Sequence, residues 1–296
     1  MSLEDARQRI KLLKHFDYSL ALFESNYKEL MSVFNYMCDN RVGIELFAII
    51  NSWKLYECQK NLGFKLHNYV CAAKSLVDHS RVLYTRVYKK QSINFGDYES
   101  EVKARFDENS LSKFVEFLRT YSQHEKLPTI ISSLSFDAQS NDGFIFTVTL
   151  DSAELLRSSS INSLSKKFIY EQGDSIDIKT ALISYHQQIC GFYNWVKARQ
   201  NDIHSEDMSL LNAQYVKERR KALKRFISTV PQTGYRGSIK EQLYEVLTDD
   251  DYKQLDQYSN NESQWLEQAL LLIESEVNQK IPDEVKAYLK SQCSIQ

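Results

Sequence analysis

Turn-forming residues are scarce in this chain. Only 8 glycines and 3 prolines occur among its 296 residues, although these two residue types are the usual markers of tight turns and of helix ends. The composition therefore leaves little room for many tight turns. We expect long helices to dominate the fold.

Cysteines are few and dispersed, and several familiar catalytic motifs are missing. No Cys-x-x-Cys pair occurs, which fits a reducing cytosol and argues against both a disulfide framework and a structural zinc site. The chain also lacks a Gly-rich phosphate loop and a Gly-x-Ser-x-Gly elbow, so kinase, Rossmann and serine-hydrolase functions have no support. We expect no bound metal and no cofactor. The cysteines are Cys38, Cys58, Cys71, Cys190 and Cys293.

The chain has neither a large net charge nor a long hydrophobic run. Its formal charge of −2 and pI near 6.3 create no global basic field, so any nucleic-acid contact must come from a local patch. The longest apolar run, residues 44–50, is interrupted by Glu45 and is too short to span a bilayer. The N-terminus is charged where a signal peptide is apolar. We expect a soluble, cytoplasmic protein that does not associate with membranes.

Apolar residues recur every three or four positions through the first part of the chain, as in amphipathic helices. The clearest case is residues 62–89, where one nearly unbroken apolar stripe predicts a buried helix face. The same spacing of apolar residues predicts helices within residues 3–38 and 43–61. A mostly polar band on the opposite side of the 62–89 helix could face solvent, a partner subunit or an active-site groove, and solvent is the preferred interpretation. This band comprises His67, Cys71, Lys74, Asp78 and Arg81.

A β-hairpin is predicted where the apolar period changes to two. Residues 130–136 and 144–150 alternate in polarity on either side of a polar turn at 138–143. Asp151 and Ser152 can cap a short helix that begins at Ala153. A Ser-rich loop or linker follows at residues 158–165. Helical spacing then returns and predicts helices around residues 178–196, 216–226 and 262–278, and a short one from Asp283.

These segments give a mainly α fold, a helical bundle with a β-hairpin insertion and a second helical block. We divide the chain into an N-terminal helical region, 1–128, a hairpin and linker, 129–165, and a C-terminal helical region, 166–296. One continuous domain is an alternative to this division. The acidic turn at 249–251 could be a metal-binding cluster, but helix N-terminal charge and capping explain it better.

The most informative segment is an arginine and a histidine near the end of a predicted helix. Apolar spacing predicts a helix over residues 110–123, capped by Asn109 or Ser110, and Pro128 follows its end. Arg119 therefore lies near the last turn and His124 at the helix exit, where the histidine could approach the arginine across the break. An arginine can stabilise charge on a phosphate, and a histidine can move a proton near neutral pH. The alternative is structural: the two side chains could simply finish a helix by interacting with its last carbonyls.

Two further Arg–His pairs occur in the chain. Arg9 and His15 lie in a charged opening helix, and Arg199 and His204 lie where a long helix runs into a polar segment. We interpret both pairs mainly as solvated faces. About one such coincidence is expected by chance in a chain this rich in arginine, so context decides between the pairs.

An early pair of long helices followed by a helix that ends in Arg-x4-His resembles the HEPN superfamily. Its members are small helical domains that serve as ribonucleases or toxins in antiviral and stress systems of prokaryotes. The resemblance covers roughly residues 40–130. It is carried by the segments Leu66-His67-Asn68-Tyr69-Val70-Cys71-Ala72-Ala73-Lys74-Ser75-Leu76-Val77-Asp78-His79 and Phe117-Leu118-Arg119-Thr120-Tyr121-Ser122-Gln123-His124.

The resemblance implies a metal-independent endoribonuclease, an effector of antiviral defence or a toxin. In such a family two copies of the motif usually meet in a homodimer and form a composite site. His124 would then be the general acid or base, and Arg119 would stabilise the transition state. HEPN nucleases commonly carry Asn, Asp or His directly after the arginine, whereas this chain has Thr120. The Thr120 hydroxyl could orient the phosphate or His124.

A local basic patch supports the alternative function, a non-catalytic helical module that binds RNA or a partner protein. Such a patch could bind a phosphate backbone, although a helix rich in lysine and arginine is more often a solvated face or a partner for acidic helices. The patch lies within one short predicted helix and consists of Lys217, Arg219, Arg220, Lys221, Lys224 and Arg225.

Overall fold

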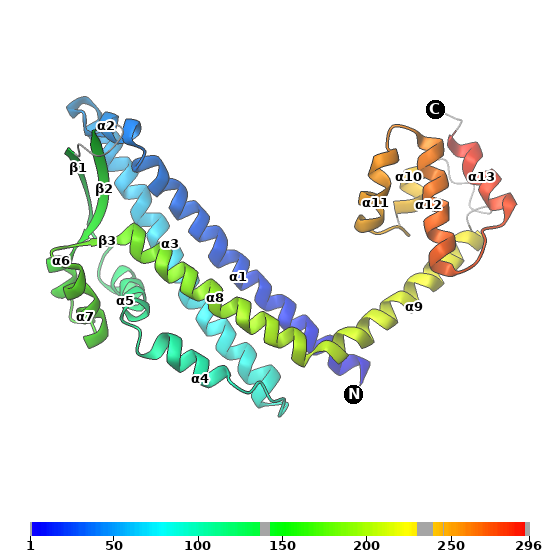
Figure 1. Ribbon diagram of the computed structural model, residues 1–296, viewed down its shortest axis with the longest axis horizontal. Helices are drawn as coiled ribbons and strands as arrows, with labels where there is room; N and C mark the ends of the chain where they lie inside the picture. Colours follow the sequence, from blue (N-terminus) through cyan, green and yellow to red (C-terminus); the bar gives the residue numbers. More distant parts are fainter. Residues whose placement is uncertain (1, 137–142, 230–238, 245, 294–296) are drawn as a thin grey trace. The chain divides into compact units, whose positions relative to one another are not determined.

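The chain forms two compact units, Met1–Ser205 and Glu206–Gln296. The computed structural model describes residues 2–136, 143–229, 239–244 and 246–293 (Figure 1). Each unit has its own hydrophobic core. The division therefore lies between Ser205 and Glu206 rather than near residue 166.

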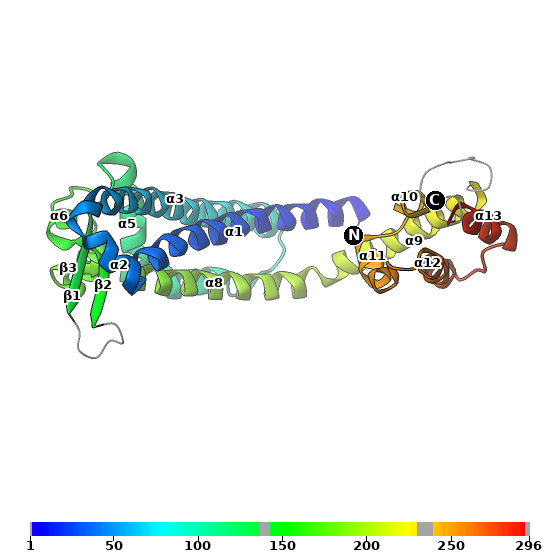
Figure 2. The same ribbon diagram turned by 90° about the horizontal axis from the view of Figure 1, so that it is seen from above.

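Long helices dominate the first unit. α1 (Leu3–Met37), α3 (Ser52–Tyr84) and α8 (Ile178–Ile203) run side by side in both ribbon views (Figures 1 and 2). The end of α3 continues into a single π-helical turn, Thr85–Lys89. Between α1 and α3 lie α2 (Asn40–Phe47) and a short 3-10 turn at Ile49–Asn51. The apolar stripe predicted on α3 faces the core, where Leu66, Tyr69 and Leu76 are at most 2% exposed.

A small antiparallel sheet lies at one end of this unit (Figure 1). β1 (Ile130–Phe136) pairs with β2 (Phe144–Asp151), with Ile130 opposite Leu150, and β2 pairs in turn with β3 (Ser175–Asp177). The hairpin prediction is confirmed for both strands. Most of its expected turn lies outside the described residues. β3 was not predicted, because three residues are too few to show an alternating pattern.

Short helices complete the first unit. α4 (Tyr98–Val102) leads through a π-helical turn at Lys103–Asp107 into α5 (Ser110–His124). After the hairpin come α6 (Ser152–Leu156) and α7 (Ser163–Gln172). Asp151 caps α6 through hydrogen bonds from the Ala153 and Glu154 amides, as predicted. The Ser-rich segment is only partly a loop, because its last residues open α7 behind an Asn162 cap.

The second unit is helical throughout the part that the structure describes. Its helices are α9 (Ser205–Thr229), α10 (Ile239–Tyr244), α11 (Asp249–Leu255), α12 (Glu262–Val277) and α13 (Asp283–Cys293), with a 3-10 turn at Asp256–Tyr258. Thr248 and Asp251 form a capping box at the start of α11. The acidic turn is thus helix capping, the preferred of its two interpretations.

The prediction of a mainly helical fold with a hairpin is confirmed. Among the described residues, no helix combines the length with the apolar character that crossing a bilayer would require. Helix bounds also agree closely with the predicted segments. For example, the expected helices at 110–123 and 262–278 correspond to Ser110–His124 and Glu262–Val277.

Candidate functional site

The candidate site is built on α5. The Asn109 side chain caps this helix by accepting a hydrogen bond from the Ser112 amide at 2.8 Å, as the sequence predicts. Phe114, Phe117 and Tyr121 are at most 2% exposed and bury one face of the helix. The helix is thereby fixed in the core of the first unit.

Arg119 and His124 point in different directions within one chain. α5 continues through His124, so the two side chains are five residue steps apart on a regular helix, a rise of about 7.5 Å and a rotation of about 140°. Arg119 is half-buried and lines a cavity. His124 is exposed and is not among the described residues around that cavity. The helix break that was expected to let them approach comes only at Glu125, after the histidine.

Thr120 is held by its own helix. Its hydroxyl donates to the Glu116 carbonyl oxygen at 3.2 Å, a common way for a helical threonine to satisfy its donor. The next hydroxyl along, that of Ser122, donates to the Arg119 carbonyl oxygen at 3.1 Å. The Thr120 oxygen keeps acceptor capacity, but its donor is already engaged within α5.

The polar band on α3 faces α5 and the cavity. The His67 Nδ1 atom lies 3.3 Å from the Ser122 Oγ atom, within hydrogen-bond distance. The Gln123 amide donates to the Cys71 Sγ atom at 3.2 Å. Lys74 and Arg81, further along the band, line the cavity. The groove alternative therefore describes His67, Cys71 and Lys74. The solvent interpretation holds better for Asp78 and Arg81, whose side chains are 48% and 63% exposed.

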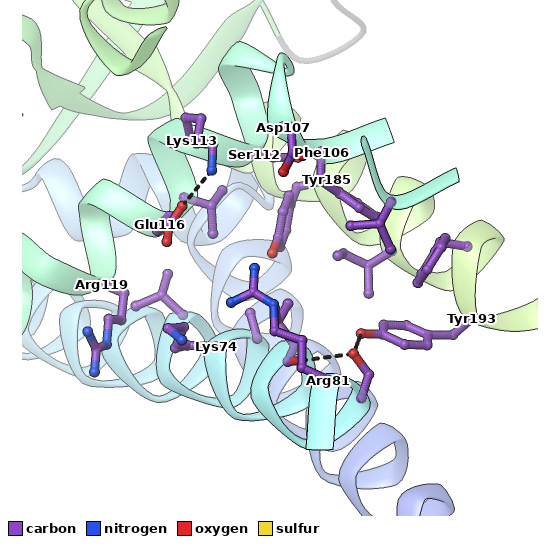
Figure 3. A pocket seen from close by; sticks show the side chains of 18 of the residues that line it. Lys74, Arg81, Phe106, Asp107, Ser112, Lys113, Glu116, Arg119, Tyr185 and Tyr193 are labelled. Atoms are coloured by element: carbon purple, nitrogen blue, oxygen red, sulfur yellow. Dashed lines mark hydrogen bonds and ion pairs between the residues drawn. The ribbon is translucent and has the colours of Figure 1, made fainter. Parts of the chain in front are cut away.

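The cavity lies between α3, α5, α8 and the π-helical turn after α4, and its volume is about 110 Å³ (Figure 3). One part of its wall is apolar and the rest is charged or hydroxylated. The apolar part includes Val70, Val77, Val102, Phe106, Ile189 and Phe192. The charged lining residues are Lys74, Arg81, Lys113, Arg119, Asp107 and Glu116.

Positive charge exceeds negative charge around this cavity. Four lysines and arginines line it against two acids. Lys113 pairs with Glu116 at 3.2 Å, and Lys74 forms an ion pair with Asp78 on its own helix. The Arg119 Nε atom is buried and has no hydrogen-bond partner among the described residues. The lining therefore offers an anion a set of cations that internal carboxylates do not fully match.

Three tyrosines add hydroxyl groups to the cavity lining. The Ser80 Oγ atom accepts hydrogen bonds from the Tyr98 and Tyr193 hydroxyls at 3.4 and 3.1 Å and donates to the Val77 carbonyl oxygen. Tyr185 is only 6% exposed and also lines the cavity. Burial raises the pKa of Tyr185, and the Glu116 charge adds to the shift. The Tyr185 hydroxyl is therefore a neutral donor at physiological pH.

Arg219 does not belong to an exposed basic patch. Its Nη2 atom lies 2.6 Å from the Asp251 Oδ2 atom and 2.7 Å from the Glu276 Oε2 atom, and its side chain is only 15% exposed. Arg219 joins α9 to α11 and α12 inside the second unit and so does not contribute to the exposed basic face. The rest of the predicted patch is exposed on α9 and consists of Lys217, Arg220, Lys221, Lys224 and Arg225.

The other two Arg–His pairs are not solvated faces. Arg9 is 8% exposed, and its Nη1 atom donates to the Gln91 side chain at 3.3 Å. His204 is 1% exposed, and its Nε2 atom lies 3.2 Å from the Tyr88 hydroxyl. That interpretation was wrong for both pairs, because one member of each is buried in the first unit.

Within the described part of the chain, no group of three or more His, Cys, Asp or Glu side chains is arranged to hold a metal ion. The chain matches no protein-family model, no curated protein and no solved structure.

Proposed function

We propose that the protein binds RNA and cleaves it without the help of a metal ion, with Arg119 and His124 as the catalytic pair. The observation that supports this proposal is the end of α5. Its histidine is exposed there, and the arginine carries a buried Nε atom without a hydrogen-bond partner in the described residues. The resemblance of this segment to the Arg-x4-His end of HEPN helices favours the same chemistry.

The proposed reaction is an internal transesterification. The RNA 2′-hydroxyl attacks the adjacent phosphorus, a new 2′-O–P bond forms, and the P–O5′ bond breaks. His124 accepts the 2′-hydroxyl proton or delivers a proton to the departing 5′-oxygen. Arg119 stabilises the extra negative charge on the phosphoryl oxygens. The products are a 2′,3′-cyclic phosphate and a 5′-hydroxyl.

The divergence of Arg119 and His124 favours a composite site. A rotation of about 140° between the two side chains prevents one helix from directing both at the same phosphate. Two copies of α5 meeting at a two-fold axis would place the arginine of one copy beside the histidine of the other. A homodimer is therefore part of the proposal. The exposed position of His124 leaves it accessible to such a partner.

The first test is cleavage of mixed cellular RNA in EDTA by the full-length protein. Wild type should produce 2′,3′-cyclic ends, and Arg119→Ala and His124→Ala should lose about 10²-fold or more of the activity. His15→Ala and Arg86→Ala are matched controls, because both residues are exposed and lie outside the cavity lining. Equal cleavage by wild type and the His124→Ala variant would exclude His124 as the catalytic residue.

A mixing experiment tests the composite site. In a composite dimer, a chain with Arg119→Ala supplies an intact His124 to a chain with His124→Ala, which supplies an intact Arg119. Random mixing of the two inactive variants should then restore up to about a quarter of the wild-type sites. Absence of recovery, with mixed dimers demonstrated by differently tagged chains, would contradict a site shared between copies.

The exposed face of α9 favours a second candidate, a non-catalytic module that binds RNA or an acidic partner protein. Lys217, Arg220, Lys221, Lys224 and Arg225 all fall within one side of a single helix. Paired reversal of Lys217 and Lys224 to Glu should weaken RNA binding and reduce its salt dependence. If wild type binds RNA without cutting it and this double variant does not bind, the module is the better description.

A further inference from the structure

The cavity beside α5 combines an apolar wall with a charged side. Val77, Ile189 and Phe192 form part of the wall, whereas Lys74 and Arg119 lie together on the charged side (Figure 3). An apolar wall is not expected in a groove that holds only water, and a cluster of cations is not expected around a simple packing void. The combination points to an amphipathic ligand.

We propose that this cavity binds a small organic anion that consists of one flat ring carrying a phosphate or a carboxylate group. Its volume of about 110 Å³ is somewhat smaller than the engineered cavity of about 150 Å³ that takes up benzene. A single six-membered ring is therefore the size of group that it accepts.

Hydroxyl groups in the lining give the ring a polar contact. Tyr185 is more than nine-tenths buried, and Figure 3 shows its hydroxyl directed into the space between α3, α5 and α8. A ring oxygen or nitrogen of the ligand can accept a hydrogen bond from this hydroxyl. Tyr98 and Tyr193 already donate to Ser80, so their oxygens are left as acceptors.

Cations then hold the anionic group. Arg81 and Tyr185 point into the same space in Figure 3, and Lys74 and Arg119 lie to one side of it. The carboxylate that pairs with Lys74 belongs to Asp78, whose side chain is 48% exposed. A partly exposed ion pair contributes little and can exchange for a ligand phosphate at small cost. Arginine and lysine together suit either a phosphate or a carboxylate.

This site does not depend on RNA cleavage. His124, which the proposed nuclease requires, is not among the described residues that line the cavity. The two proposals share Arg119 only. A His124→Ala protein should therefore lose cleavage and still bind the small anion, which separates failure of one proposal from failure of the other.

Isothermal titration of the full-length protein tests the proposal with four probes. Phenyl phosphate and benzoate each carry one flat ring and a charge, whereas benzyl alcohol lacks the charge and inorganic phosphate lacks the ring. We expect at least one ring-bearing anion to bind at least tenfold more tightly than both incomplete probes. The better of the two identifies a phosphate or a carboxylate as the anionic group that the cavity prefers.

Conservative variants locate the binding site. Tyr185→Phe removes only the hydroxyl and should weaken binding about threefold to tenfold, and Lys74→Gln should weaken it by a similar factor. Lys60→Gln is the matched control, because Lys60 lies on the same helix but not on the cavity. Circular dichroism establishes that each variant is folded. The proposal is overturned if neither ring-bearing anion binds, if inorganic phosphate binds equally well, or if both cavity variants bind like wild type.

Discussion

Replacing Arg219 by leucine should destabilise the second unit while leaving RNA binding intact. The guanidinium lies between Asp251 and Glu276, whose side chains are 14% and 25% exposed. Its removal leaves two carboxylates facing each other without their cation. Loss of one partner from a fully buried ion pair costs about 3–5 kcal/mol. Because both acids keep some solvent contact and Thr248 still hydrogen-bonds Asp251, we expect about 2–3 kcal/mol here.

Trp265 offers a local reporter for this change. It is 2% exposed in the core of the second unit, so its fluorescence follows the unfolding of that unit. A background with Trp53→Phe and Trp195→Phe leaves Trp265 as the sole tryptophan, since the chain has 3. Urea titrations then compare Arg219→Leu with Lys224→Leu. The exposed Lys224 should change the free energy of unfolding by less than about 0.5 kcal/mol.

RNA binding gives the complementary measurement, made at a temperature at which every variant is folded. Arg219→Leu should keep its affinity, whereas Lys224→Glu should lose affinity most strongly at low salt. The reasoning is refuted if Arg219→Leu unfolds at the same urea concentration as wild type. It is also refuted if this variant loses more RNA affinity than Lys224→Glu does.

Two further predictions concern stability. Gly43→Ala should destabilise the first unit by about 1–3 kcal/mol, since a Cβ atom there would lie 2.9 Å from the Phe146 side chain. Gly191→Ala, with open space around it, should instead increase the stability of this unit by about 0.5–1 kcal/mol. Thermal melts that rank the two variants alike would contradict the packing argument. Burial lowers the pKa of His186 to about 4, so stability should fall as pH drops from about 6.5 to 4, where the unfolded chain takes up a proton and the folded chain does not. His186→Phe, which keeps a ring against Tyr27, should remove about 1–2 kcal/mol of that fall, and urea titrations at pH 7 and pH 5 with unchanged pH dependence would refute the assignment.

Local signals in the sequence predicted the secondary structure well. The α5 helix, its Asn109 cap and the hairpin after Pro128 all depend on residues close together in the chain. Periodicity and capping residues report such short-range preferences directly. The capping of α11 by Thr248 and Asp251 belongs to the same class.

The candidate site was less predictable because its parts come from distant segments. Phe106, Tyr185 and Arg81 belong to different elements, and only the folded chain brings them around one cavity. The polar residues along α3 were a usable signal, since a band of that length on a buried helix needs partners. Nothing near Arg219 in the sequence reveals Asp251 or Glu276. The same limitation led to the incorrect solvated interpretation of His204, which contacts Tyr88 more than a hundred positions earlier in the chain.

α5 is one continuous helix that connects the cavity with an exposed surface of the first unit. It carries Arg119 at the cavity and His124 at its exposed end, and no break in the helix separates them. The Tyr121 hydroxyl, which lies between them on α5, donates a hydrogen bond to the Glu154 Oε1 atom at 2.8 Å. Because α5 has no break between the two residues, a displacement of the helix at Arg119 would also move His124. An occupant that shifts α5 at the cavity would therefore also shift the exposed end of the helix that carries His124.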